Sequence, residues 1–164
     1  MKPRVPRSAL RNPRRGMTLI EVIVAFTILM IISTMAVPLA RSRVRKIREH
    51  DLNAALREMR LAIDKYKDAA DSNKLGPQKQ DGYGYPETLE ALVNGVKAAG
   101  AAGADTKIKF LRRIPKDPMT NSYECGLRSM QDDPGSNGWG GQNVFDVHTK
   151  SDLKAADGTA YADW

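Results

Sequence analysis

The stretch Met17-Thr18-Leu19-Ile20-Glu21 opens a long apolar run that continues to Ala40 and decides the fold. Glu21 is the only ionisable side chain between Met17 and Ala40. At ~1.5 Å of rise per residue, a helix over this run measures ~36 Å, which is enough to cross a bilayer core of about 30 Å. The run therefore predicts a membrane-spanning helix over residues 17–40.

A carboxylate inside such a helix requires an explanation. On insertion scales it costs about 2.5 to 3.5 kcal/mol at the centre of the membrane and less near an end. Glu21 lies near the N-terminal end of the run, so its cost is reduced but not removed. Glu21 is therefore the first candidate for a functional residue.

The residues around the start of the run, Arg15-Gly16-Met17-Thr18-Leu19-Ile20-Glu21-Val22, resemble the processing site of type IV pilins and pseudopilins. The resemblance implies that residues 1–16 form a leader peptide and that a prepilin peptidase cuts between Gly16 and Met17. The same enzyme would methylate the new N-terminus at Met17, where the family usually has Phe. It also implies that Glu21 pairs with the N-terminal amine of a neighbouring subunit. Such a pair specifies one register of assembly, because each buried charge alone costs several kcal/mol.

Two other interpretations of the N-terminal segment are weaker. An ordinary secretory signal, cut after Ala40, has an apolar core of only about 7 to 15 residues, whereas this core is longer and contains Glu21. The segment could also be a plain signal anchor with an incidental glutamate. The combination of basic leader, Gly16, Glu21 and long apolar run favours the pilin-like interpretation.

The formal net charge of +7 is concentrated near the N-terminus, which argues against nucleic-acid binding. The segment 51–164 is slightly acidic. By the positive-inside rule, the leader cations place the N-terminus in the cytoplasm and the domain 41–164 in the periplasm, across the bacterial inner membrane. A second basic cluster after the apolar run is predicted to contact the membrane surface or acidic neighbours in a filament. The leader cations are Lys2, Arg4, Arg7, Arg11, Arg14 and Arg15, and those of the second cluster are Arg41, Arg43, Arg45, Lys46 and Arg48.

The helical pattern continues beyond the apolar run, from residue 42 to about residue 70. Apolar residues recur there at spacings of three to five with charges between them, which is typical of a helix with one face on a core. We therefore expect one long helix, with a transmembrane half and an amphipathic half. The apolar positions are Val44, Ile47, Leu52, Ala55, Met59, Ile63 and Tyr66.

The C-terminal part of the chain has strand and turn signals. A short helix is predicted over residues 86–95, and two strands follow around residues 123–127 and 143–148. In the first strand Tyr123, Cys125 and Leu127 alternate on one face, and in the second Phe145 and Val147 are expected to point inward. The predicted fold class is α+β and pilin-like, with the long N-terminal helix packed on a small antiparallel β-sheet.

Two single residues have competing interpretations. Cys125 is the only cysteine, so it forms no internal disulfide and is expected to be a small buried apolar residue. Trp139 lies in a Gly/Asn-rich turn, where a tryptophan that caps the core is favoured over one that recognises a partner. His50 and His148 are isolated and are expected to be structural or exposed.

The segment Phe110-Leu111-Arg112-Arg113-Ile114-Pro115-Lys116-Asp117-Pro118 resembles the entry to the sheet in the major pseudopilin of type II secretion. That family binds calcium in its C-terminal loop, so the resemblance implies calcium ligands at Asp152 and Asp157. Composition alone favours solvated turn aspartates instead, although calcium does take carboxylate and carbonyl oxygens from flexible loops. Asp163 is a less secure ligand, and Asp146 is expected to serve the end of the strand.

The sequence shows no phosphate-binding loop, no Cys/His metal spacing and no local nucleophile–base pattern, so no enzyme is predicted. The resemblance implies a structural subunit of a type II secretion pseudopilus, a periplasmic filament that helps to export folded proteins. Its implied partners are further copies of the chain, minor pseudopilins, the prepilin peptidase, an inner-membrane platform protein and membrane lipid. The alternatives are a type IV pilin of a surface fibre, and a membrane-anchored periplasmic domain that never polymerises.

Overall fold

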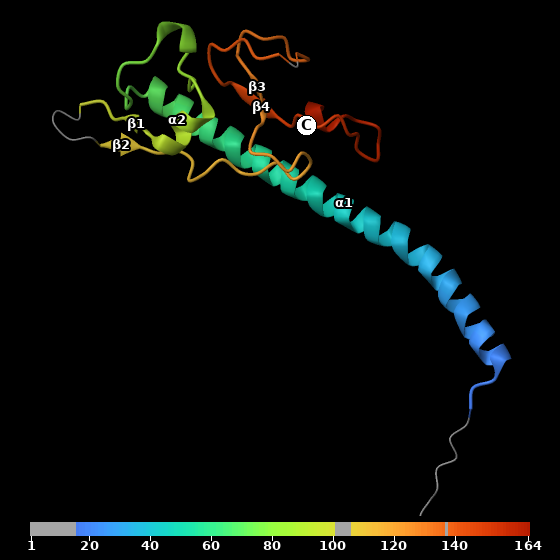
Figure 1. The fold of residues 1–164 in the computed structure, drawn as a ribbon. Coiled ribbons are helices and arrows are strands. Elements are labelled where there is room, and N and C mark those ends of the chain that lie inside the picture. Colours follow the sequence, from blue (N-terminus) through green and yellow to red (C-terminus); the bar gives the residue numbers. More distant parts are fainter. Residues whose placement is uncertain (1–15, 101–105, 137) are drawn as a thin grey trace, which may run out of the picture. The chain divides into compact units, whose positions relative to one another are not determined.

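The computed structural model describes residues 16–100, 106–136 and 138–164. The chain divides into two compact units, Met1–Arg43 and Val44–Trp164. Helix α1, Leu19–Asp71, begins in the first unit and continues through the second (Figure 1). The leader residues 1–15, with their six cations, lie outside the described residues.

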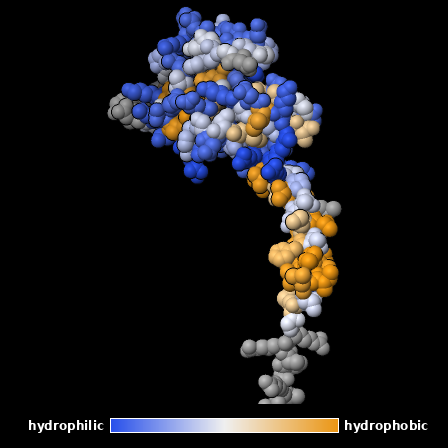
Figure 2. Space-filling model, turned by 45° about the vertical axis from the view of Figure 1, so that its right-hand side comes forward, coloured by the Kyte–Doolittle hydropathy of each residue, from blue (hydrophilic) through white to orange (hydrophobic). Residues whose placement is uncertain are grey.

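In the first unit, most of the apolar residues of α1 are exposed. Their side chains gather in large apolar patches along the helix (Figure 2). An apolar stretch of 18 residues in α1, with a mean hydropathy of 2.5, is 0% buried inside the structure, and α1 is the one described helix that is long and apolar enough to cross a bilayer. Exposed apolar residues of this segment include Ile20, Phe26, Leu29, Met30, Ile31 and Leu39.

In the second unit, the same helix buries one face in a hydrophobic core. The buried residues recur at the helical spacing that the sequence predicts, because only one face of an amphipathic helix meets the rest of the domain. The prediction fails at its N-terminal end, since Val44 is 50% exposed and Ile47 is 60% exposed. The core residues that α1 contributes are Leu52, Leu56, Met59, Ala62, Ile63 and Tyr66.

The rest of the second unit wraps around this face of α1. A 3-10 turn, Gln80–Gly82, precedes helix α2, Leu89–Asn94, which buries Leu89 and Leu92. Strand β1, Val96–Lys97, pairs with β2, Lys107–Ile108. Strand β3, Gly126–Arg128, pairs with β4, Asp146–His148, and a final 3-10 turn spans Tyr161–Asp163. Both pairs are antiparallel, so the fold is α+β, and the described residues form two separate two-stranded sheets where one small sheet was predicted.

The predicted alternation along the two C-terminal strands is wrong at two positions. Tyr123 is 63% exposed because β3 begins only at Gly126, so that Tyr123 precedes the strand. Phe145 is 45% exposed and contacts Tyr85 edge to face, with ring centroids 5.2 Å apart. The inward residues here are Val144 and Val147, both fully buried.

The cause of this offset is an irregular backbone before β4. The Val144 N–H donates to the Pro86 carbonyl at 2.8 Å, and the Phe145 N–H donates to the Arg128 carbonyl at 2.8 Å. Two consecutive residues therefore bond to different neighbours, and the period of two is lost between Val144 and Val147. A regular strand pattern could not have indicated this.

Candidate functional site

Gly16 and Met17, the predicted processing residues, are exposed at the start of the described chain. No atom lies within 4 Å of a Cβ placed on Gly16, and Met17 is 69% exposed. Both residues precede the first residue of α1, Leu19. The predicted cleavage point thus lies in accessible backbone outside the helix, although cleavage itself stays a prediction.

At the start of α1, Thr18, which the sequence analysis did not single out, accepts two hydrogen bonds. The Glu21 main-chain N–H donates to Thr18 Oγ1 at 3.4 Å, and the Val22 N–H donates to the Thr18 carbonyl at 3.3 Å. Thr18 and Glu21 are three residues apart, which is the spacing of the Ser/Thr-x-x-Glu capping signal that could have identified Thr18. The helix therefore begins immediately after the predicted new N-terminus.

The Glu21 carboxylate is exposed and in the first turn of α1. Within the part of the chain that the structure describes, it has no hydrogen-bond or ion-pair partner. A carboxylate is favourable at a helix N-terminus because of the orientation of the backbone dipoles. Glu21 is thus available to a positively charged group from outside the chain, and its assembly role stays a prediction.

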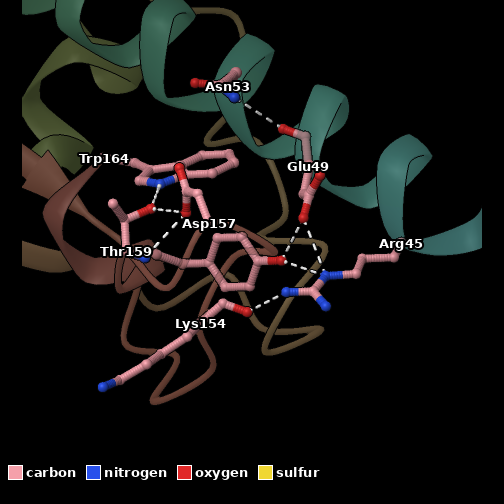
Figure 3. A network of polar contacts seen from close by, with 8 residues as sticks. Arg45, Glu49, Asn53, Lys154, Asp157, Thr159 and Trp164 are labelled. Atoms are coloured by element: carbon pink, nitrogen blue, oxygen red, sulfur yellow. Dashed lines mark hydrogen bonds and ion pairs between the residues drawn. The ribbon is translucent and has the colours of Figure 1, made fainter. Parts of the chain in front are cut away.

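The second predicted site is the C-terminal loop, which we define as residues 150–164. Asp152 and Asp157 are both exposed. Asp157 closes a turn: its Oδ1 accepts from the Thr159 N–H at 2.9 Å and from Thr159 Oγ1 at 2.7 Å (Figure 3). These two bonds hold the pKa of Asp157 below its usual range. Asp157 is therefore a structural acceptor within its own loop.

Several carbonyl groups of the C-terminal loop also accept hydrogen bonds. The Ala155 N–H donates to the Thr159 carbonyl at 2.7 Å, and the Gly158 N–H donates to the Ala155 carbonyl at 3.0 Å. The Tyr161 N–H donates to the Leu153 carbonyl at 3.1 Å. These are the oxygens that a calcium ion would need in addition to two carboxylates.

The donor set therefore does not fit a calcium ion in the observed arrangement of the loop. Among the residues that the structure describes, no three His, Cys, Asp or Glu side chains gather in a way that could hold a metal. Asp146 pairs with Arg60 at 2.7 Å, and Asp163 is exposed in the final turn. Calcium binding by Asp152 and Asp157 stays a prediction from the sequence, without support from this geometry.

The segment that ends in Asp117-Pro118 has a structural role. Asp117 is 3% exposed, and its Oδ1 accepts from the Met119 N–H at 2.7 Å. Its Oδ2 accepts from Thr149 Oγ1 at 2.5 Å, directly after β4. Asp117 thus ties the turn that follows it to the residues after β4, which positions the start of the C-terminal loop.

Cys125 and Trp139 have different outcomes. Cys125 is buried, and burial together with nearby Asp117 raises the pKa of its thiol to about 11, so the thiol is protonated and the predicted apolar role is confirmed.

Trp139 is 41% exposed and lies outside the core cluster. Its Nε1 donates to the Asn143 carbonyl at 2.8 Å, which holds the ring over its own loop. The prediction that Trp139 caps the core is wrong.

Comparison with known proteins agrees with the family resemblance. Residues 11–37 match the model of the prokaryotic N-terminal methylation motif. Type II secretion system core protein G of Aeromonas hydrophila is 30% identical over 70% of this chain and 73% of its own length. The chain belongs to this family. The core protein G of Pseudomonas aeruginosa is 29% identical over 70% of this chain and 74% of its own length. That of Escherichia coli is 26% identical over 68% of this chain and 71% of its own length. No solved structure gives a significant match.

Membership of the core protein G family identifies the chain as a pseudopilin. The methylation motif contains the Gly16–Met17 bond and Glu21, and the matched span ends within the exposed apolar half of α1. Among the other residues of functional interest, Arg45 was predicted only as one member of a basic cluster. No sequence signal separated it from its neighbours, because its partners are far away in the chain.

Proposed function

We propose that this chain is a structural subunit of a type II secretion pseudopilus, processed between Gly16 and Met17 and N-methylated at Met17. The observation that carries the proposal is the apolar half of α1, in which all but one of the described side chains are exposed, with Glu21 as its single carboxylate. A surface of this kind is stable in lipid or against other apolar helices, and not in water.

Assembly follows from the same surface. Apolar helices from further copies would pack on residues 19–40, and Glu21 of one copy would pair with the methylated amine of a neighbour. The pair fixes the register because neither charge is tolerated alone in an apolar bundle. Minor pseudopilins and an inner-membrane platform protein are the further partners of such a filament, together with lipid before assembly.

We also infer the orientation from charge. The leader holds cations and no anion, so it would stay on the cytoplasmic side while the second unit lies in the periplasm. In this arrangement the subunit contributes to export mechanically and performs no catalysis. The type IV pilin and the non-polymerising anchor have no observation of their own in their favour.

Processing is tested by the intact mass of the chain from membranes, with and without a prepilin peptidase. The expected product starts at methylated Met17, and Gly16→Leu should block its formation because the enzyme must bind an unhindered backbone at this position. Gly135→Leu is the matched control, since Gly135 is also exposed and has open space around it. An uncut chain, or one cut after Ala40, would contradict the proposal.

Assembly is tested by imaging sheared filaments from cells that make the chain at native level. Periplasmic filaments that require the other secretion components are the expected result. Long surface fibres made without those components would instead support the type IV pilin.

A further inference from the structure

Two guanidinium groups of α1 contact the C-terminal loop: Arg60 Nη2 donates to the Trp164 carbonyl at 2.7 Å, whereas Arg45 contacts two residues of the loop, Lys154 and Tyr161. Arg45 Nη2 donates to the Lys154 main-chain carbonyl, and Arg45 Nε donates to Glu49 Oε1 at 3.1 Å (Figure 3). The same Nε lies 3.0 Å from the hydroxyl oxygen of Tyr161, which accepts from it. One cation thus contacts a carbonyl, a carboxylate and a hydroxyl, which come from α1 and from two points of the loop.

Tyr161 makes this arrangement specific. Its hydroxyl donates to Glu49 Oε1 at 2.6 Å, while its side chain is otherwise buried, with 2% of the residue exposed. Burial and the hydrogen bond to Glu49 raise the pKa of Tyr161, so the hydroxyl remains a donor across the physiological range. The ring also contacts Trp164 edge to face, with centroids 4.9 Å apart.

The neighbouring cations make no equivalent contacts. In the part of the chain that the structure describes, Lys46 and Arg48 are exposed without a hydrogen-bond or ion-pair partner, although they share the helix and the charge of Arg45. Arg45 differs in two respects. It lies four residues before Glu49, the spacing at which two side chains meet on a helix. It also contacts Lys154 and Tyr161 of the C-terminal loop.

We propose that the Arg45 guanidinium is the resident cation of the C-terminal loop and fills the role that the family resemblance assigns to calcium. Calcium binds a loop by gathering carboxylate and carbonyl oxygens, and Arg45 gathers the same kinds of oxygen with N–H donors that do not lose their charge. Asp157 and several of the loop carbonyls that a metal would need already accept hydrogen bonds from within the loop. The fold of the loop is therefore independent of calcium, whether or not the chain assembles into a filament.

The test is hydrogen exchange of the full chain in detergent, read at peptides from residues 150–164 and, as reference, from the core face of α1. Arg45→Ala should speed exchange of the loop by at least about tenfold without changing the reference peptides, because the loop opens locally. Arg48→Ala is the matched control, with the same loss of charge on the same helix, and should leave loop exchange unchanged. Excess calcium or a chelator should have no effect on the unmodified chain.

A double-mutant cycle separates the specific contact from a general loss of stability. Tyr161→Phe keeps the buried ring and removes only the hydroxyl. Because Arg45 and Tyr161 act through one cluster, Tyr161→Phe should add little to loop exchange once Arg45 is already alanine. Fully additive effects, equal effects of Arg45→Ala and Arg48→Ala, or a loop that loosens when calcium is removed would each overturn the proposal.

Discussion

The two halves of α1 have opposite relations to the rest of the chain. Residues 19–40 present apolar side chains that nothing described in this protein covers, whereas residues 52–66 bury theirs against α2, the strands and the final turn. Both halves form the same type of helix, so helix formation does not distinguish them. The difference shows that the second half is completed by its own domain and that the first half requires an external environment, either lipid or other subunits.

The largest effect is expected from Glu21→Gln, which removes the charge and keeps the size of the side chain. Filament assembly should be lost, because the N-terminal amine of a neighbour would then be buried without a partner. The thermal unfolding of the second unit should not change, since Glu21 has no partner among the described residues. Counting sheared filaments and recording the melting temperature of the same preparation checks both statements. Normal filaments from this variant would refute the pairing.

Met59→Ala tests the completed half of α1. Met59 is 1% exposed, and truncation of a buried Met costs about 2–5 kcal/mol in the free energy of unfolding. Leu61→Ala, on the same helix, should cost less than about 1 kcal/mol because Leu61 is 51% exposed. Denaturant unfolding of the full chain in detergent measures both values. Equal losses of unfolding free energy at the two positions would show that the face of α1 assigned to the core is wrong.

Gly126→Ala tests the packing between β3 and β4. Gly126 pairs with His148, and a Cβ on Gly126 would lie 2.2 Å from His148 Nε2. The ring is buried and cannot move freely, so overpacking should cost about 1–3 kcal/mol. The control is Gly135→Ala, where open space surrounds the new methyl group. The cost at Gly126 should shrink when His148 is also truncated to Ala, and an unchanged cost would identify a different cause.

The sequence predicted those parts of the structure that depend on local pattern. The apolar run, the isolated Glu21 and the helical spacing of Leu52, Met59 and Ile63 each follow from residues close together in the chain. The face that Phe145 occupies could not be predicted, because it is set by hydrogen bonds to Pro86 and Arg128 on other segments.

The contact between Arg45 and Tyr161 was missed for the same reason. The two residues are more than a hundred positions apart, and Arg45 is one of five cations in the basic cluster that follows the apolar run. The composition of the C-terminal loop suggested turn aspartates, and Asp157 does cap Thr159, whereas calcium was implied only by the family resemblance. Residue types in this loop thus predicted local turns better than they predicted a ligand.

The smallest expected effect concerns pH and a single buried histidine. His148 is 3% exposed, and its Nδ1 is the one buried side-chain nitrogen or oxygen without a hydrogen bond among the described residues. Burial lowers the pKa of His148, and the positive charge of Arg128 lowers it further. Arg60 and Lys150 act in the same direction, while Asp146 opposes them.

The sign of the pH dependence follows from that lowered pKa. The unfolded chain binds a proton at His148 near pH 6.5, whereas the folded chain binds it only at lower pH, so acid favours unfolding. The melting temperature should therefore be constant above about pH 7, begin to fall through about pH 6.5, and stop falling from this cause below the folded pKa. His148→Gln should flatten this part of the curve, and His50→Gln, at an exposed side chain, should leave it unchanged.

Asp132 and Asp157 do not confound the result because their pKa values are lowered from an already acidic range. If the melting temperature of His148→Gln still falls through about pH 6.5, another group causes the pH dependence, and the only role left for His148 is in the packing of β3 on β4.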